Sequence, residues 1–279
     1  MDRRTVLGLI ATAGIAGVFG ATPVRASGST AAVATALNLA GRQRMLAQRL
    51  AKAWLMVGLN ISPVRARALL DESRVTQQKD FLSLLDFAAS HNVHPPLADL
   101  GRQWAAYLAT LGAKPSRDNA QSVYDASEAV SRSAHALVLA CERISGTPAR
   151  DRIINIAGRQ RMLSQRMAKF MLFKAWDINA RAAQMEANFS RAEFSSGMHQ
   201  LFLNVGDMQE TRKLLEEMDR MWLEYRTLMD RQLDNPELGR RLPRIVDLSE
   251  EILAQCERLV VALERSITGQ KAGVPAATT

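Results

Sequence analysis

The sequence predicts an all-α protein built as two tandem antiparallel four-helix bundle modules that form an intramolecular pseudo-dimer. The first observation is a repeat: residues 38–55 (NLAGRQRMLAQRLAKAWL) and 155–172 (NIAGRQRMLSQRMAKFML) are identical at 13 of 18 positions. A repeat this close, at the period of a small domain, indicates one module used twice. The second observation is that apolar residues recur at helical spacing, whereas alternating β-branched runs bounded by Asn-Gly turns are absent.

Breaks rich in proline and glycine divide each copy into four helices. In the first copy we expect helices at residues 31–60, 63–90, 97–112 and 118–145. In the second copy we expect them at residues 149–177, 179–205, 207–233 and 244–268. Long helices with short connections suit an up-down bundle. The modules therefore span residues 31–146 and 149–268, and the small, polar residues 269–279 are expected to form a disordered tail.

The repeat extends into the third helices, where Trp104 and Tyr107 match Trp222 and Tyr225. Large aromatic residues at matching positions of a helical repeat are more typical of core packing than of a binding site. We therefore expect these four side chains to anchor the two bundle cores.

The N-terminal residues 1–26 resemble an export signal. Arg3 and Arg4 precede an uncharged apolar stretch, and a small-residue cleavage site falls before Ser27. The RRTVL run favours a twin-arginine signal, with a Sec signal or an uncleaved anchor as alternatives. No later stretch holds 18 uncharged apolar residues, so we expect no membrane span in the mature chain and a periplasmic location.

Composition excludes several classes of function. The net charge of +8 is spread without a run of five like charges, which predicts no nucleic-acid binding. His91 and His94 have no carboxylate or cysteine company, so neither a metal site nor a cofactor is expected. Cys141 and Cys256 could form a disulfide or remain buried thiols. No catalytic constellation is recognisable, and we expect the protein not to be an enzyme.

Function is expected in the repeated helix because its polar residues recur together with its apolar stripe. Arg44 is flanked at helical spacing by small residues only, and Arg161 is flanked in the same way. Small side chains allow another helix to approach, so both guanidinium groups are expected to be partly buried and to need a partner. Neither motif contains Asp or Glu, and each carries four positive charges.

These unfavourable features recur in both copies, and an anion-binding role explains them. Arginine presents a planar fork of donors to an oxyanion, and Gly41 and Gly158 permit close backbone approach. Arg42, Arg49 and Lys52 are instead expected to pair with acids of neighbouring helices, for which the candidates are Asp71, Glu72, Glu128 and Glu142.

The motif AGRQRMLxQR at residues 40–49 and 157–166 resembles the signature of the sensor domain shared by NarX-type nitrate/nitrite sensor kinases and PilJ-type chemotaxis transducers. In the NarX-type family, the resemblance implies a periplasmic four-helix bundle with nitrate or nitrite held between equivalent arginines of two subunits. By motif match those arginines are Arg44 and Arg161. We expect Gly41 and Gly158 to complete the anion site, with support from Asn38, Asn155, Arg42, Arg159, Gln48 and Gln165.

The chain departs from that family in having two sensor modules and no second transmembrane segment, HAMP, kinase or methyl-accepting region. We therefore expect an exported protein that binds or senses nitrate or nitrite and lacks its own output domain. Its expected partner is a membrane sensor kinase, transporter or chemoreceptor. The alternative is a structural or interaction protein that docks on a pilus or chemoreceptor assembly. A metal- or haem-binding helical protein is disfavoured because no His, Met and Cys residues cluster.

Overall fold

A computed structural model describes residues 25–206, 208–229 and 235–268, and this part of the chain contains eight α-helices and no strand. The prediction of an all-α protein is confirmed. The first copy of the repeat contains α1 (Arg25–Gly58), α2 (Pro63–Ala88), α3 (His94–Leu111) and α4 (Arg117–Ile144). The second contains α5 (Pro148–Ala175), α6 (Ala180–Asn204), α7 (Gln209–Leu228) and α8 (Asn235–Thr268).

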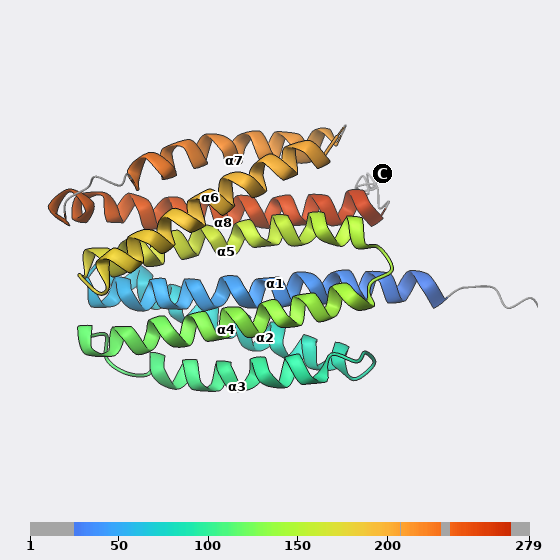
Figure 1. Cartoon of the computed structure of the whole chain (residues 1–279), viewed down its shortest axis with the longest axis horizontal. Helices are drawn as coiled ribbons and strands as arrows, with labels where there is room; N and C mark the ends of the chain where they lie inside the picture. Colours follow the sequence, from blue (N-terminus) through green and yellow to red (C-terminus); the bar gives the residue numbers. More distant parts are fainter. Residues whose placement is uncertain (1–24, 207, 230–234, 269–279) are drawn as a thin grey trace, which may run out of the picture.

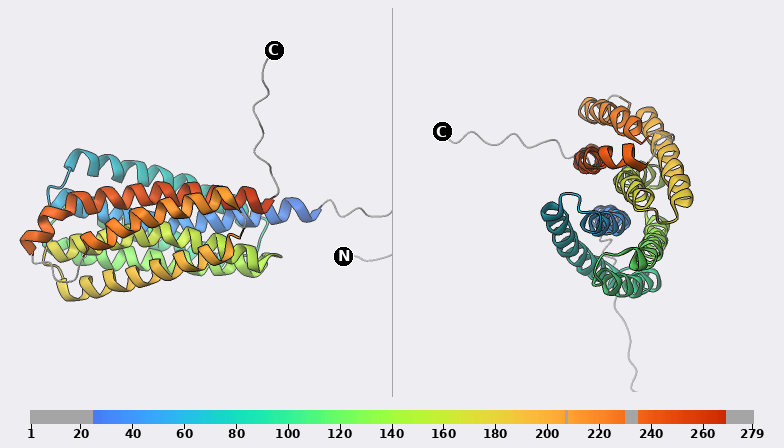
Figure 2. Two further views of the ribbon diagram at one scale, coloured as in Figure 1. Left: turned by 90° about the horizontal axis from the view of Figure 1, so that it is seen from above. Right: turned by 90° about the vertical axis from the view of Figure 1, so that its left-hand side faces the viewer.

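The two motif helices, α1 and α5, lie side by side at the centre of the molecule and run in the same direction (Figure 1). Helices α2 and α4 pack on α1, and α3 packs on α4. In the second copy, α6 and α8 pack on α5 in the same way, and α7 packs on α8. The end-on view in Figure 2 shows each motif helix partly enclosed by helices of its own copy, with the two copies meeting between α1 and α5.

The repeated aromatic residues of α3 and α7 tie each module together. Tyr107 donates a hydrogen bond of 2.8 Å to the carbonyl oxygen of Ala47, and Tyr225 donates one of 2.8 Å to that of Ser164. Trp104 and the equivalent tryptophan of α7 are also buried. The prediction that these aromatic residues anchor the two cores is confirmed, because each tyrosine fixes its helix to the motif helix of the same copy.

Three helix starts differ clearly from the predictions, and the first is that of α1, which begins at Arg25 instead of residue 31. Helix α3 begins at His94 instead of residue 97, because prolines are tolerated in the first helical turn, where their missing N–H would have no partner. Helix α8 begins at Asn235 instead of residue 244 and contains Pro243 in its interior. An interior proline costs about 3 kcal/mol. Burial of Leu238 and Leu242 before it and of Ile245 after it offsets this cost at about 1.5–3 kcal/mol each.

Residues 1–24 and 269–279 lie outside the described part of the chain, so the export signal at 1–26 and the disordered tail stay predictions. Arg25 and Ala26 belong to the first turn of α1. Within the described ranges, no helix combines the length and the apolar character that crossing a membrane requires.

Candidate anion-binding site

Most polar side chains of the repeated motif point into the molecule, because α1 and α5 are each surrounded by other helices. The buried polar residues of the two motif helices are Gln43, Arg44, Gln48, Arg49, Lys52, Asp151, Gln160, Arg161, Ser164, Gln165, Lys169 and Lys174. A buried polar group needs a hydrogen bond, and a buried charge also needs a counter-charge. The partners of these residues therefore show which of them are satisfied by the protein itself.

Arg44 of α1 is 2% exposed and has only neutral partners. Its Nη2 donates a hydrogen bond of 2.8 Å to Oδ1 of Asn155 in α5, and its Nη1 lies 3.4 Å from Nδ1 of His135 in α4. Among the described residues, no carboxylate forms an ion pair with Arg44. Burial, followed by repulsion from Arg159 and Arg161, lowers the pKa of Arg44 to about 9, and the attraction of Glu142 does not cancel this effect. The guanidinium remains charged at neutral pH.

Arg161 of α5 occupies the equivalent position but has an acidic partner. Its Nη2 donates a hydrogen bond of 2.6 Å to Oδ1 of Asn38, which mirrors the bond from Arg44 to Asn155. Its Nη1 forms an ion pair of 2.8 Å with Glu257 of α8. The motif itself contains no acid, and the sequence analysis did not identify this partner. The two arginines are therefore equivalent in their contacts to asparagine and unequal in charge compensation.

Both guanidinium groups approach Gly41. A Cβ atom placed on this glycine lies 3.4 Å from Nη2 of Arg44 and 3.8 Å from Nη2 of Arg161, so the two nitrogens are at most about 7.2 Å apart, the sum of these distances. A Cβ on Gly158 lies 3.2 Å from Nη2 of Arg161. A Cβ at Gly158 would crowd the Arg161 guanidinium, whereas the distances at Gly41 are those of ordinary van der Waals contact, so close approach accounts for the helical glycine of the second motif only.

The two asparagines connect the arginines to further acids. Asn38 donates a hydrogen bond of 2.9 Å to Glu264 of α8, and Asn155 donates one of 2.7 Å to Glu142 of α4. Each asparagine thus accepts from the arginine of the other copy and donates to a carboxylate. Both asparagines are predicted from the sequence as supporting residues. The sequence does not predict that each accepts a hydrogen bond from the arginine of the other copy.

Arg42 and Arg159 point away from the arginine pair. Arg42 forms an ion pair with Asp80 of α2, and Arg159 forms one of 2.9 Å with Glu193 of α6. Gln48 donates a hydrogen bond of 2.7 Å to Ser131. Gln165 donates one of the same length to the carbonyl oxygen of Ser249. These four residues, expected to support the anion site, connect each motif helix to other helices of its own copy.

A second charged cluster lies further along α1 and α5 and crosses between the copies. Glu250 of α8 forms ion pairs of 2.5 Å with Lys52 and 2.6 Å with Arg49 of α1. In the mirrored arrangement, Glu128 of α4 forms ion pairs of 2.7 Å with Lys169 and 3.0 Å with Arg166 of α5.

Burial opposes ionisation of both glutamates, but their basic neighbours lower the pKa of each to about 2. Arg49 and Lys52 thus pair with acids as predicted. Glu72 is a further partner of Arg49, at 3.3 Å, but the main acid, Glu250, was not among the candidates.

The acids next to the motif helices follow a pattern in the fourth helices. Glu128, His135 and Glu142 are spaced by seven residues in α4, and Glu250, Glu257 and Glu264 have the same spacing in α8. Residues seven apart lie on one face of a helix. Aligning the two helices at this spacing identifies all six positions and shows that His135 is the only one that is not an acid.

The other sequence candidates are not assembled into a site. Cys141 and Cys256 are both buried free thiols, so the disulfide alternative is wrong. His91 stacks on Phe87, with ring centroids 3.9 Å apart, instead of joining His94 in a metal site. Among the described residues, no group of His, Cys, Asp and Glu could hold a metal ion.

The fold and this interface define a class: an all-helical protein whose duplicated motif helices enclose a buried pair of arginines. The chain belongs to the family described as type IV pili methyl-accepting chemotaxis transducer N-term, or PilJ, whose model matches residues 27–129 and 150–248. Each matched range falls on one copy of the repeat. The family consists of sensor domains that are typically periplasmic, and not of enzymes. No curated protein and no solved structure gives a match to this chain.

Proposed function

We propose that this protein is an exported sensor or binding protein that holds one small oxyanion, nitrate or nitrite, next to Arg44 and Arg161. In this proposal the two copies act as an intramolecular pseudo-dimer, and α1 and α5 each contribute one arginine to a single pocket. Membership of a sensor-domain family supports the general role. The position of the arginine pair between the two copies supports the location of the pocket.

The observation that carries the proposal is the charge state of Arg44. A buried guanidinium without a carboxylate partner is unfavourable, and the same-sign charge of Arg161 adds to the cost. Two unit charges about 7 Å apart repel by about 2 kcal/mol at an effective dielectric near 20. A monoanion between the two groups relieves this repulsion, whereas a neutral ligand does not.

The donors around Gly41 suit a planar oxyanion. The Nη2 atoms of both arginines currently donate to asparagine oxygens, and a nitrate oxygen can replace these acceptors with charge-assisted bonds. Such bonds contribute about 1.5–3 kcal/mol each. The ligand binds only the folded form, so binding raises the stability of the protein.

The output of the sensor requires a second protein in this proposal. Among the described helices, none is long and apolar enough to span a membrane. A membrane sensor kinase, a transporter or a chemoreceptor in the same compartment is the class of partner that fits a family of chemotaxis sensor domains.

The proposal is tested by calorimetric titration of the protein, without residues 1–26, against nitrate, nitrite, sulfate and chloride. We expect one site per chain and preference for nitrate or nitrite. Arg44→Met should abolish most of the binding because it removes the uncompensated charge. His135→Glu should have a similar effect, since it gives Arg44 the carboxylate that Arg161 already has in Glu257.

The matched control is Glu257→Gln, which removes the acid next to Arg161 and should preserve or strengthen binding. Two independent sites per chain would contradict a shared pocket. Unchanged nitrate affinity in His135→Glu would show that the uncompensated charge of Arg44 does not bind the anion.

A further inference from the structure

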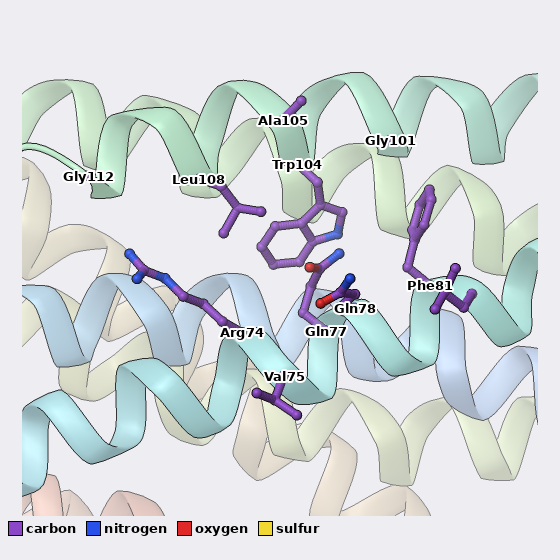
Figure 3. A pocket seen from close by; sticks show the side chains of 11 residues that line it. Arg74, Val75, Gln77, Gln78, Phe81, Gly101, Trp104, Ala105, Leu108 and Gly112 are labelled. Atoms are coloured by element: carbon purple, nitrogen blue, oxygen red, sulfur yellow. The ribbon is translucent and has the colours of Figure 1, made fainter.

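A groove of about 760 Å³ lies on the outer side of the first copy, between α2 and α3. Figure 3 shows its side chains entering from both helices, with the indole ring of Trp104 pointing from α3 toward α2. Its lining combines apolar and polar residues, including Arg74, Val75, Gln77, Phe81, Trp104 and Leu108. The groove is remote from the α1–α5 interface, and none of the anion-site residues lines it.

Two polar side chains in this groove have no hydrogen-bond partner among the described residues. Gln77 is 6% exposed, and its side chain makes no hydrogen bond among the described residues. Nε1 of Trp104 is buried and is also unpaired. In Figure 3 the side chain of Gln77 points from α2 toward the indole of Trp104. A buried donor without an acceptor is costly and uncommon in folded proteins, so Nε1 of Trp104 indicates a missing acceptor.

The equivalent groove of the second copy is filled. Phe194 replaces Gln77 and packs on Trp222, with ring centroids 4.5 Å apart. Leu223 replaces Ala105, and Asp219 replaces Gly101. The remaining space is about 460 Å³, compared with about 760 Å³ in the first copy. The same helix pair can thus be closed by larger side chains, and the opening in the first copy results from its own residues.

The arginines of the two grooves also differ, because within the described part of the chain one is hydrogen-bonded and the other is not. Arg191 of α6 donates a hydrogen bond of 3.2 Å to the carbonyl oxygen of Met229 and thereby links α6 to the end of α7. Arg74 occupies the equivalent position in α2 and forms no ion pair or hydrogen bond among the described residues. Arg74 and Gln77 are three residues apart on α2, so they lie on the same face, one turn from each other.

We propose that this groove binds a small organic acid that has an apolar, preferably aromatic, body. The carboxylate accepts hydrogen bonds from Trp104 and Gln77 and pairs with Arg74. The body lies against Phe81 and against the apolar side chains that line the groove. The ligand is an acid because the groove offers the unpaired indole N–H of Trp104 and the charge of Arg74, and no acidic side chain lines it.

The test uses 3-phenylpropionate as the probe in calorimetric titrations of the whole protein. Two comparison compounds separate the contributions: 3-phenylpropanol retains the body without the charge, and propionate retains the charge without the body. We expect binding of 3-phenylpropionate with an affinity at least about tenfold higher than that of either compound, which corresponds to one lost charged hydrogen bond or the lost apolar contact.

Gln77→Phe introduces the residue that the second copy carries and should abolish binding while preserving the fold. Arg74→Gln should weaken it at least about tenfold. Its matched control, Arg191→Gln in the closed groove, should bind the probe like the parent protein. The proposal is overturned if the parent does not bind the probe, if Gln77→Phe binds like the parent, or if Arg191→Gln loses as much affinity as Arg74→Gln. Nitrate binding should be unchanged in Gln77→Phe. The proposal for this groove and the proposal for the arginine site can therefore be contradicted independently.

Discussion

The α1–α5 interface contains two charged regions that differ in how completely their buried charges are paired within the chain. In the second charged cluster, here called the lysine cluster, each copy supplies one glutamate to two basic residues of the other copy: Glu250 to Arg49 and Lys52, and Glu128 to Arg166 and Lys169. This arrangement is symmetrical. At the arginine pair, Glu257 compensates Arg161, whereas Arg44 faces the neutral His135. Buried charge in this helix pair is therefore treated in two ways: the lysine cluster is paired within the chain and links the copies, whereas Arg44 is left without an acidic partner among the described residues, which is the basis of the proposed anion site.

The largest expected effect is loss of stability in acid, and it arises at the lysine cluster. Glu128 and Glu250 have folded-state pKa values of about 2, below the ordinary value of 4.5, so the unfolded state binds more protons between these values. Their contribution is complete above pH 4.5 and is lost as the pH falls toward 2, at about 3 kcal/mol for each residue. Chemical denaturation at a series of pH values measures this loss. A flat stability profile across this window would falsify the assignment of these glutamates as ionised partners.

Glu250→Gln and Glu128→Gln test the symmetry of the lysine cluster. Each substitution leaves a fully buried lysine without its counter-charge, and we expect each to cost about 3–5 kcal/mol. Urea titration of the two variants measures the cost. A difference of several kcal/mol between them would show that the two copies contribute unequally even here.

His135→Glu tests the asymmetry of the arginine pair without ligand. The new carboxylate compensates Arg44, so we expect the free energy of unfolding to rise by about 1–2 kcal/mol in the absence of anions. The reverse change, Glu257→His, should lower it. Thermal denaturation in an anion-poor buffer measures both. Equal and opposite effects would support charge compensation as the difference between the two arginines. Destabilisation by His135→Glu would contradict it.

Asp247→Asn provides the smallest effect and a reference for exposed charge between the copies. Asp247 of α8 pairs with Arg65 of α2, and both side chains are more than 40% exposed. An exposed pair contributes about 0–1 kcal/mol, so the change in stability should be below 1 kcal/mol. A larger loss in urea titration would mean that the buried clusters are not the main polar link between the copies.

Most of the fold could be predicted from the sequence, because the repeat and the helical periodicity are local signals. Pro243 was misread as a boundary since a proline usually ends a helix, and the apolar contacts that keep α8 continuous are made with distant residues. The glycines and arginines of the motif could be identified for a similar reason, because the small residues that flank each arginine lie in the same helix as the arginine.

The asymmetry of the site could not be predicted from the motif. The partners that distinguish Arg44 from Arg161 lie 91 and 96 residues away along the chain, in α4 and α8. Glu128 and Glu250 serve the motif helix of the opposite copy, which depends on how α1 and α5 pack. In the sequence, only the seven-residue spacing of these positions in α4 and α8 indicates the partners. The spacing is recognised when the two helices are aligned with each other.

The difference between His135 and Glu257 has a genetic consequence. In a dimer of identical subunits, one codon specifies both sides of a shared pocket, so every substitution appears twice and the pocket remains symmetrical. Here the two sides are encoded separately, at positions 135 and 257. In the proposed anion site, a single substitution can therefore change the charge next to one arginine while the contacts of the other arginine stay as they are, and selection can alter the two contacts one at a time.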